Sequence, residues 1–215
     1  MTPHEEILAV FPLPNVVFFP GTSLPLHIFE PRYCEMVRQT IVNKQHIGMF
    51  LLRPGWEQDY YGNPPIFPIG CAGELAFVEN LPDDKFNIVL KGVYRVRALG
   101  TVQENPYRKA RVEILSEVLQ QDASTLEVTR TSLLEAYRRI TTGNPELDAL
   151  TDFTAFVNSM ASTLRLDLET KSQLLTEDDV YVRAQTLERI LRQQAALVDW
   201  TSRFGHLRPP DPNVN

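Results

Sequence analysis

Three side chains that can take part in acid–base chemistry lie close together near the N-terminus. They are His27, Glu30 and Arg32, and they sit in a stretch rich in proline. A histidine and a carboxylate at this spacing could serve as general acid and base. Glu30 and Arg32 also flank Pro31, where a helix is expected to begin, and side chains at such junctions commonly bind unpaired backbone groups. We therefore favour a structural junction over catalysis.

The motifs of common enzyme classes are missing from the chain. There is no GxxxxGK[ST] phosphate loop, no GxSxG nucleophile elbow and no HExxH metal pair. The four histidines lie far apart in the sequence: His4, His27, His46 and His206. Cys34 and Cys71 form no CxxC pattern, which favours buried thiols in a reducing compartment. We expect no catalytic residue, no metal and no cofactor.

Basic side chains alternate with apolar ones on two predicted strands. The residues of this basic face are Lys91, Arg95, Arg97, Lys109 and Arg111. Neighbouring basic strands could track an RNA backbone. Glu113 lies on the same face, however, and no aromatic residues interleave the charges to stack bases. We favour a solvent-exposed sheet face and keep an RNA-binding module as the alternative.

A loop rich in glycine and proline, residues 53–68, carries an unusual number of large apolar side chains. They are Trp56, Tyr60, Tyr61, Ile66 and Phe67. Loops lie mostly on protein surfaces, where clustered aromatic rings tend to mark binding sites. The other reading is that two or three of these rings fold back over the mouth of a barrel. Both readings stay open, and the loop is the best candidate for a polypeptide-binding surface.

Most of these candidate residues lie on or beside predicted strands in the first half of the chain. Residues 86–98 are the clearest case, because the even positions are apolar or small and the odd ones include Asn87 and Lys91. A period of two with one apolar face predicts a long, half-buried strand. Residues 47–52 are nearly all apolar, which predicts a central strand buried on both faces. Many strands of uneven length suggest a closed or partly closed barrel.

Five prolines between residues 11 and 31 exclude a helix there, and Pro20-Gly21 predicts a turn. A helix is predicted near residues 31–43. From about Ser124 the apolar period becomes helical, with one stripe running from Leu147 to Leu164. We therefore predict a β-barrel subdomain over residues 1–120, a helical subdomain over 121–207 and a disordered tail over 208–215.

The sequence motif FPG followed by PLHIFEPRY, at residues 19–21 and 25–33, resembles that of the LON substrate-binding family. That family includes the N-terminal domain of the Lon protease. Residues 92–97, GVYRVR, look like its Gly-x-x-Arg strand, and residues 164–187 look like its terminal helical part. The resemblance implies an α+β fold: a PUA-like β pseudo-barrel followed by a C-terminal helical subdomain. Because the phosphate loop is missing, we expect a free-standing member without ATPase or protease domains.

By this resemblance the protein binds unfolded or exposed polypeptide segments, or a partner protein, without catalysis. An unrecognised hydrolase using His27 or Glu30 is a lesser alternative. The formal net charge of −6 argues against broad binding to nucleic acid or anionic membranes. No stretch reaches the ~18 consecutive apolar residues of a membrane span, and the N-terminus has no secretory pattern. We expect a cytoplasmic protein.

Overall fold

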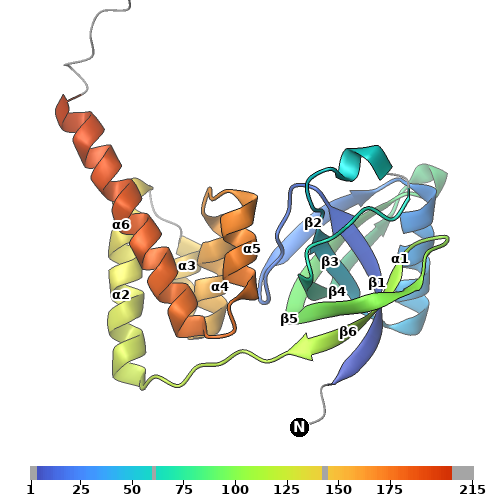
Figure 1. The fold of residues 1–215 in the computed structure, drawn as a ribbon, viewed down its shortest axis with the longest axis horizontal. Coiled ribbons are helices and arrows are strands. Elements are labelled where there is room, and N and C mark those ends of the chain that lie inside the picture. Colours follow the sequence, from blue (N-terminus) through green and yellow to red (C-terminus); the bar gives the residue numbers. More distant parts are fainter. Residues whose placement is uncertain (1–3, 60–61, 142–144, 205–215) are drawn as a thin grey trace, which may run out of the picture.

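The N-terminal half contains six strands, and five of them close into a ring (Figure 1). The computed structural model describes residues 4–59, 62–141 and 145–204. The sheet order is β2-β5-β4-β3-β1-β6, and a further pairing of β5 with β6 closes all but β2 into the ring. The strands are β1 Glu5–Leu13, β2 Ser23–Ile28, β3 Ile47–Leu51, β4 Ile69–Asn80, β5 Phe86–Gln103 and β6 Lys109–Leu115. The predicted barrel followed by helices is confirmed.

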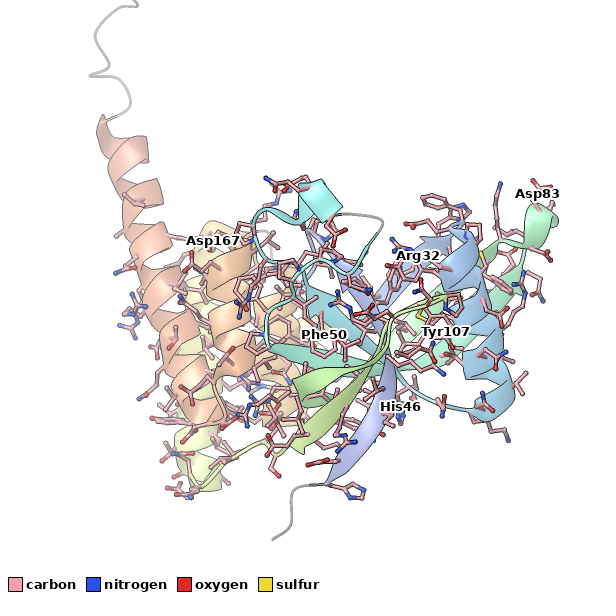
Figure 2. All side chains as sticks on the ribbon, turned by 45° about the vertical axis from the view of Figure 1, so that its right-hand side comes forward. Arg32, His46, Phe50, Asp83, Tyr107 and Asp167 are labelled. Atoms are coloured by element: carbon pink, nitrogen blue, oxygen red, sulfur yellow. The ribbon has the colours of Figure 1, made fainter. Side chains whose placement is uncertain are left out.

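The ring is filled by side chains that each of its five strands contributes. Strand alternation points every second residue inward, and Phe50 lies at the centre of this cluster (Figure 2). The other fully enclosed members are Leu8, Val10, Ala72, Val96, Ala110 and Val112. β3 pairs with β1 on one side and with β4 on the other, and all its residues are buried. The central strand predicted from residues 47–52 is therefore confirmed.

Helix α1, Pro31–Asn43, covers the outer face of one side of the sheet. Pro31 stands at the start of the helix, where a missing N–H costs nothing. Met36 and Val37 are fully buried against Ile88 and Leu90 of β5 in a second apolar cluster. Both cysteines are buried in that cluster, and burial raises the pKa of each thiol.

The turn at Gly21 lies shortly before β2, within the proline-rich segment. Gly21 has a φ of +80°, and its N–H donates to the Gly92 carbonyl at 2.8 Å. A β-branched residue is strained in this region, so Gly21→Val should lower the free energy of unfolding by ~1–3 kcal/mol. Thermal melts measure the effect, with Gly100→Val as the control because no atom lies within 4 Å of a Cβ built there. Equal melting temperatures for the two variants would contradict the strain argument.

The C-terminal half is helical, and side chains cap several of its helices. The helices are α2 Ala123–Ile140, α3 Pro145–Ala149, α4 Phe153–Thr163, α5 Leu168–Thr176 and α6 Val180–Phe204. Asp122, Asp152 and Asp167 each accept a hydrogen bond from the backbone N–H three residues on. Bonds from Ser124 and Thr125 lower the pKa of Asp122 to about 2. The single stripe predicted over residues 147–164 is divided between α3 and α4, because the Asp152 cap starts a new helix.

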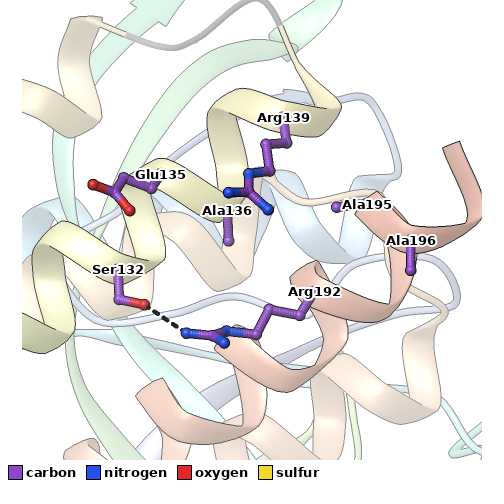
Figure 3. A pocket seen from close by; sticks show the side chains of 7 residues that line it. All are labelled: Ser132, Glu135, Ala136, Arg139, Arg192, Ala195 and Ala196. Atoms are coloured by element: carbon purple, nitrogen blue, oxygen red, sulfur yellow. Dashed lines mark hydrogen bonds between the residues drawn. The ribbon is translucent and has the colours of Figure 1, made fainter. Parts of the chain in front are cut away.

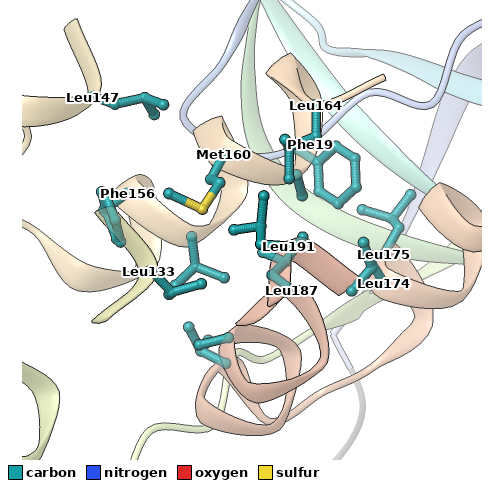
Figure 4. Packing of buried hydrophobic residues seen from close by; sticks show 14 of the residues in the cluster. Phe19, Leu133, Leu147, Phe156, Met160, Leu164, Leu174, Leu175, Leu187 and Leu191 are labelled. Atoms are coloured by element: carbon teal, nitrogen blue, oxygen red, sulfur yellow. The ribbon is translucent and has the colours of Figure 1, made fainter. Parts of the chain in front are cut away.

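The helical half and the ring share one apolar core (Figure 4). Leu133, Phe156 and Leu187 of the helices belong to it together with Phe19, which comes from the segment between β1 and β2. Val17, Leu51 and Ile69 of the N-terminal half join the same cluster. Among the described residues, no helix is both long and apolar enough to cross a bilayer. The tail predicted for residues 208–215 lies outside the described part of the chain.

Candidate docking surface

The predicted basic face is divided by an irregularity in β5. Gly92 pairs with Gly73 and Tyr94 pairs with Ala72, which leaves Val93 as an extra residue between them. Such a bulge shifts the alternation of side chains by one position. Lys91 and Arg95 consequently project from opposite faces of the strand. The expectation that Arg95 is exposed was wrong, because its side chain is completely buried under the helical half.

Arg95 is held by both halves of the molecule. Its Nη1 donates to the Leu175 carbonyl at 3.0 Å, and its Nη2 donates to the Ser116 carbonyl at 2.9 Å and to Asp178 Oδ1 at 2.8 Å. Its Nε lies 3.2 Å from Glu117 Oε1. A guanidinium offers donors in a fixed fork, which suits this convergence of acceptors. Arg95 therefore joins β5 to the helices and is unavailable to an external ligand.

A second buried arginine completes this joint. Arg183 of α6 donates to Asn158 Oδ1 at 2.5 Å and to Glu117 Oε2 at 3.0 Å, so Glu117 lies between the two guanidinium groups. The pKa of Arg183 is lowered, mainly because the guanidinium is buried. Both arginine side chains are completely buried and the bridging Glu117 is partly buried, which indicates a structural role for this cluster.

The other basic residues are exposed or partly exposed but largely paired. Arg97 pairs with Glu113 at 2.5 Å, and Arg111 lies 3.9 Å from Glu5. The Lys109 ammonium lies 5.4 Å from the centre of the Tyr107 ring. Lys91 is exposed on the far face of β5. These residues do not form one continuous basic surface with Arg95.

The aromatic loop contributes side chains to the interior of the ring and to the core of the helical half. Ile66 packs against the interior of the ring, and Phe67 packs against the core of the helical half. Trp56 is half-buried and begins a short 3-10 turn, η1, Trp56–Asp59. Tyr60 and Tyr61 lie outside the described residues. Of the five predicted binding residues, at least two therefore serve packing in the folded protein.

The histidine and carboxylate of the proline-rich segment point to different partners. His27 Nδ1 lies 2.9 Å from Asn87 Oδ1, whereas Arg32 Nε donates to Glu30 Oε2 at 3.0 Å. Glu30 occupies the N-cap position of α1 but makes no side-chain cap hydrogen bond. The geometry supports the structural junction and shows no acid–base pair between His27 and Glu30, although the carboxylate binds Arg32 instead of capping the helix.

Beyond the ring, three strands continue as a small sheet that we call the platform. It consists of β2, residues 86–91 of β5 and residues 74–80 of β4. One of its faces lies against the α1 cluster through residues such as Leu26 and Ile88. Alternation turns the next residues to the opposite face, where Pro25 and Phe77 are exposed and Val89 is partly buried. The platform thus has one covered and one open face.

The open face carries an apolar row across all three strands. Pro25 and Phe77 are both register partners of Val89, so the three side chains are neighbours. Phe77 is 56% exposed, which is unusual for a large aromatic residue. The sequence offered one local sign of it: residues 75–78 are all apolar, more than a strand with a single buried face requires.

A polar row lies beside the apolar row and is internally hydrogen-bonded. Asn87 Nδ2 donates to Glu79 Oε2 at 2.8 Å, and Asn87 Oδ1 faces His27 Nδ1. The His27 ring stacks on Phe29 with centroids 5.9 Å apart, and Phe29 is 59% exposed. Two exposed aromatic rings therefore border an ordered surface that is already in place without a ligand.

A hollow in the helical half is less suited to binding apolar ligands. Figure 3 shows the residues that line it between α2 and α6, among them Ser132, Arg139 and Arg192. Arg192 donates to Ser132 Oγ at 3.1 Å and to Glu188 Oε1 at 2.6 Å. The side chains that line the hollow are small or charged, and the charge of Arg192 is partly neutralised by Glu188. The platform is therefore the stronger candidate.

The arrangement of a mixed strand ring, an outer helix and a C-terminal helical half defines a domain fold also seen in solved structures. The Lon N-terminal domain protein from Xanthomonas campestris matches with a TM-score of 0.65 at 22% identity, covering 85% of this chain and 96% of that one. The N-terminal domain of Mycobacterium avium complex Lon protease matches with a TM-score of 0.57 at 18% identity, covering 92% and 98%. The shared architecture is the Lon N-domain fold.

The sequence gives the family directly. The model of the ATP-dependent protease La (LON) substrate-binding domain matches residues 7–193, and the chain belongs to this family. The Lon protease of Anaeromyxobacter dehalogenans is 24% identical over 206 residues, which are 92% of this chain and 24% of that protein. Lon protease 2 of Myxococcus xanthus is 24% identical over 207 residues, or 93% and 25% of the two chains. The chain spans about a quarter of the length of these relatives.

Proposed function

We propose that the open face of the platform binds polypeptide segments and that the protein acts by binding, without catalysis. The observation that carries this proposal is the apolar row of Pro25, Val89 and Phe77 on a face that nothing in the described part of the chain covers. The family's description as a substrate-binding domain of a protease supports a polypeptide as the ligand.

Physical chemistry favours this surface as an anchor. Burial of apolar area drives most protein association, and exposed aromatic rings supply much of it at a small cost in side-chain entropy. Phe77 and Phe29 each keep more than half of their surface in contact with water. The hydrogen-bonded polar row holds His27 and Asn87 in fixed positions between them, so little ordering is needed when a ligand binds.

The loop over residues 53–68 remains a second candidate through Trp56. Because Ile66 and Phe67 are packed into the two cores, we assign them a structural role and not a direct contact with ligand. RNA binding by the basic strand residues has less support, since Arg95 is buried and Arg97 is paired with a carboxylate. RNA retention that weakens steeply with salt would favour that alternative.

The double substitution Phe29→Ser and Phe77→Ser should weaken binding to reduced, carboxymethylated α-lactalbumin, a permanently unfolded protein, about tenfold or more. The melting temperature of the double variant should stay close to that of the wild type, because both rings are largely exposed. Fluorescence anisotropy of the labelled α-lactalbumin measures the affinity.

Val128→Ser is the matched control, since Val128 is 71% exposed on α2, away from the platform. The control should bind like the wild type. Unchanged affinity in the double variant would show that the binding site lies elsewhere, and Trp56→Ser then tests the loop. A large loss of stability would instead show that the rings belong to the core.

A further inference from the structure

One edge of the platform has backbone groups that are free to pair. β3 pairs with residues 71–73 of β4, and the pairing ends at Gly73. Within the described part of the chain, residues 74–80 of β4 pair with β5 alone. The N–H and C=O groups on the outer side of this segment therefore form an open strand edge. Such an edge can accept an extended chain as an additional strand.

A groove runs along this open edge on the covered face of the platform. It lies between residues 74–78 of β4 and the C-terminal turns of α1 and has a volume of about 360 Å³. Its apolar lining is formed by Ile41 of α1, which is 45% exposed, and by Leu75 and Val78 of β4. The rest of the lining is polar: Thr40, Lys44, Gln45, His46 and Glu74. The groove offers an apolar site of side-chain size directly beside unpaired backbone.

The edge consequently has an apolar site on each face. Leu75 and Val78 face the groove, whereas Phe77 belongs to the apolar row on the open face. Side chains of an added strand alternate between the two faces of the sheet. One set would enter the groove, and the other set would lie beside Phe77. The bulge at Ala76 leaves residues 77–80 as the regular part of this edge.

We propose that an extended polypeptide segment with alternating apolar side chains and flanking basic residues binds by strand addition to residues 74–80 of β4. This inference rests on the proposed polypeptide-binding function and specifies how the polypeptide is held. Charge favours a basic partner: the edge segment itself contains Glu74 and Glu79 and no basic residue, although Lys44 and His46 line the groove. Antiparallel self-pairing of two copies would bring these carboxylates together, whereas a basic segment complements them. The opposite platform edge, β2, contains Pro25, which lacks a backbone donor.

The test uses a fluorescein-labelled peptide with a core of alternating leucine and threonine between pairs of lysines. Three forms are compared: unmodified, N-methylated at every leucine and N-methylated at every threonine. In an added strand only alternate residues direct their N–H groups toward the partner. One methylated form should bind about tenfold or more weakly than the unmodified peptide, and the other less than about twofold more weakly. Equal binding of all three forms would overturn strand addition.

Variants of the full chain locate the peptide. Ile41→Ser and Phe77→Ser should each weaken binding of the unmodified peptide, whereas Val128→Ser should not. Replacing the peptide lysines with glutamates should also weaken binding. Suppose that Phe77→Ser weakens binding of the unmodified peptide, that Ile41→Ser does not, and that both methylated peptides bind as tightly as the unmodified one. Strand addition is then overturned and the proposed function stands.

Two further outcomes are distinct. If the wild-type chain binds neither the peptide nor carboxymethylated α-lactalbumin, the proposed function itself fails. If sedimentation shows a dimer that Ile41→Ser dissociates, a second copy occupies the edge and the proposal is overturned.

Discussion

Replacing Arg95 with methionine should lower the free energy of unfolding by about 3–5 kcal/mol, the scale for removing one partner of a buried ionic network. Methionine fills much of the same volume but removes every donor of the guanidinium. The Leu175 and Ser116 carbonyls and the carboxylate of Asp178 would lose the bonds they now receive from Arg95. Urea unfolding followed by circular dichroism gives the free-energy difference.

Arg97 provides the matched control for this experiment. It stands two residues further along the same strand and pairs with Glu113, but its side chain is 44% exposed. Arg97→Met should therefore cost less than about 1 kcal/mol, as exposed ion pairs generally do. Similar losses for the two variants would show that the burial of Arg95 does not govern its contribution.

Gly92→Ala should also destabilise the fold, by about 3 kcal/mol or more, because the added methyl group overpacks a site enclosed by backbone. A Cβ there would lie 2.2 Å from the Phe19 carbonyl oxygen and 3.1 Å from the Pro20 Cα. The neighbouring chain cannot easily withdraw, since the Gly92 N–H donates to the Thr22 carbonyl at 2.9 Å and the Gly21 N–H donates to the Gly92 carbonyl.

Gly100→Ala is the control for this substitution, because Gly100 lies in the same strand and a Cβ there meets no atom within 4 Å. Thermal melts of the two alanine variants should differ clearly, with the larger decrease for Gly92→Ala. A Gly92→Ala protein that melts with the Gly100→Ala protein would mean that the contact with Phe19 yields at little cost.

Local sequence patterns predicted individual elements well. The apolar even positions of residues 86–90 face the α1 cluster, and Pro31 starts the predicted helix. Pairing partners are only partly local, since β5 forms hairpins with its chain neighbours β4 and β6 but also pairs with β2, which is distant in sequence. The bulge at Val93 depends on the exact register between β5 and β4 and changes the face to which Arg95 belongs. A period-two pattern carries no mark of such a shift, so the burial of Arg95 could not be predicted from it.

The candidate site was harder to foresee than the fold. Pro25, Phe77 and Val89 come from three strands and become neighbours only through the sheet register. The aromatic loop was more conspicuous in the sequence, because its large residues all fall within one short segment, residues 53–68. Composition alone could not decide which rings face inward, and Ile66 and Phe67 turned out to pack against the cores.

The presence of Val17 and Phe19 in the core of the helical half bears on how the chain folds during synthesis. These residues leave the ribosome early, whereas Leu133, Phe156 and Leu187, which share that core, are made much later. A nascent barrel therefore carries uncovered apolar side chains until the helices emerge, a state prone to association with chaperones or other chains. Contacts this distant in sequence also slow folding. Burial of Val17 and Phe19 is therefore complete only after the last helix, which contributes Leu187, has been made.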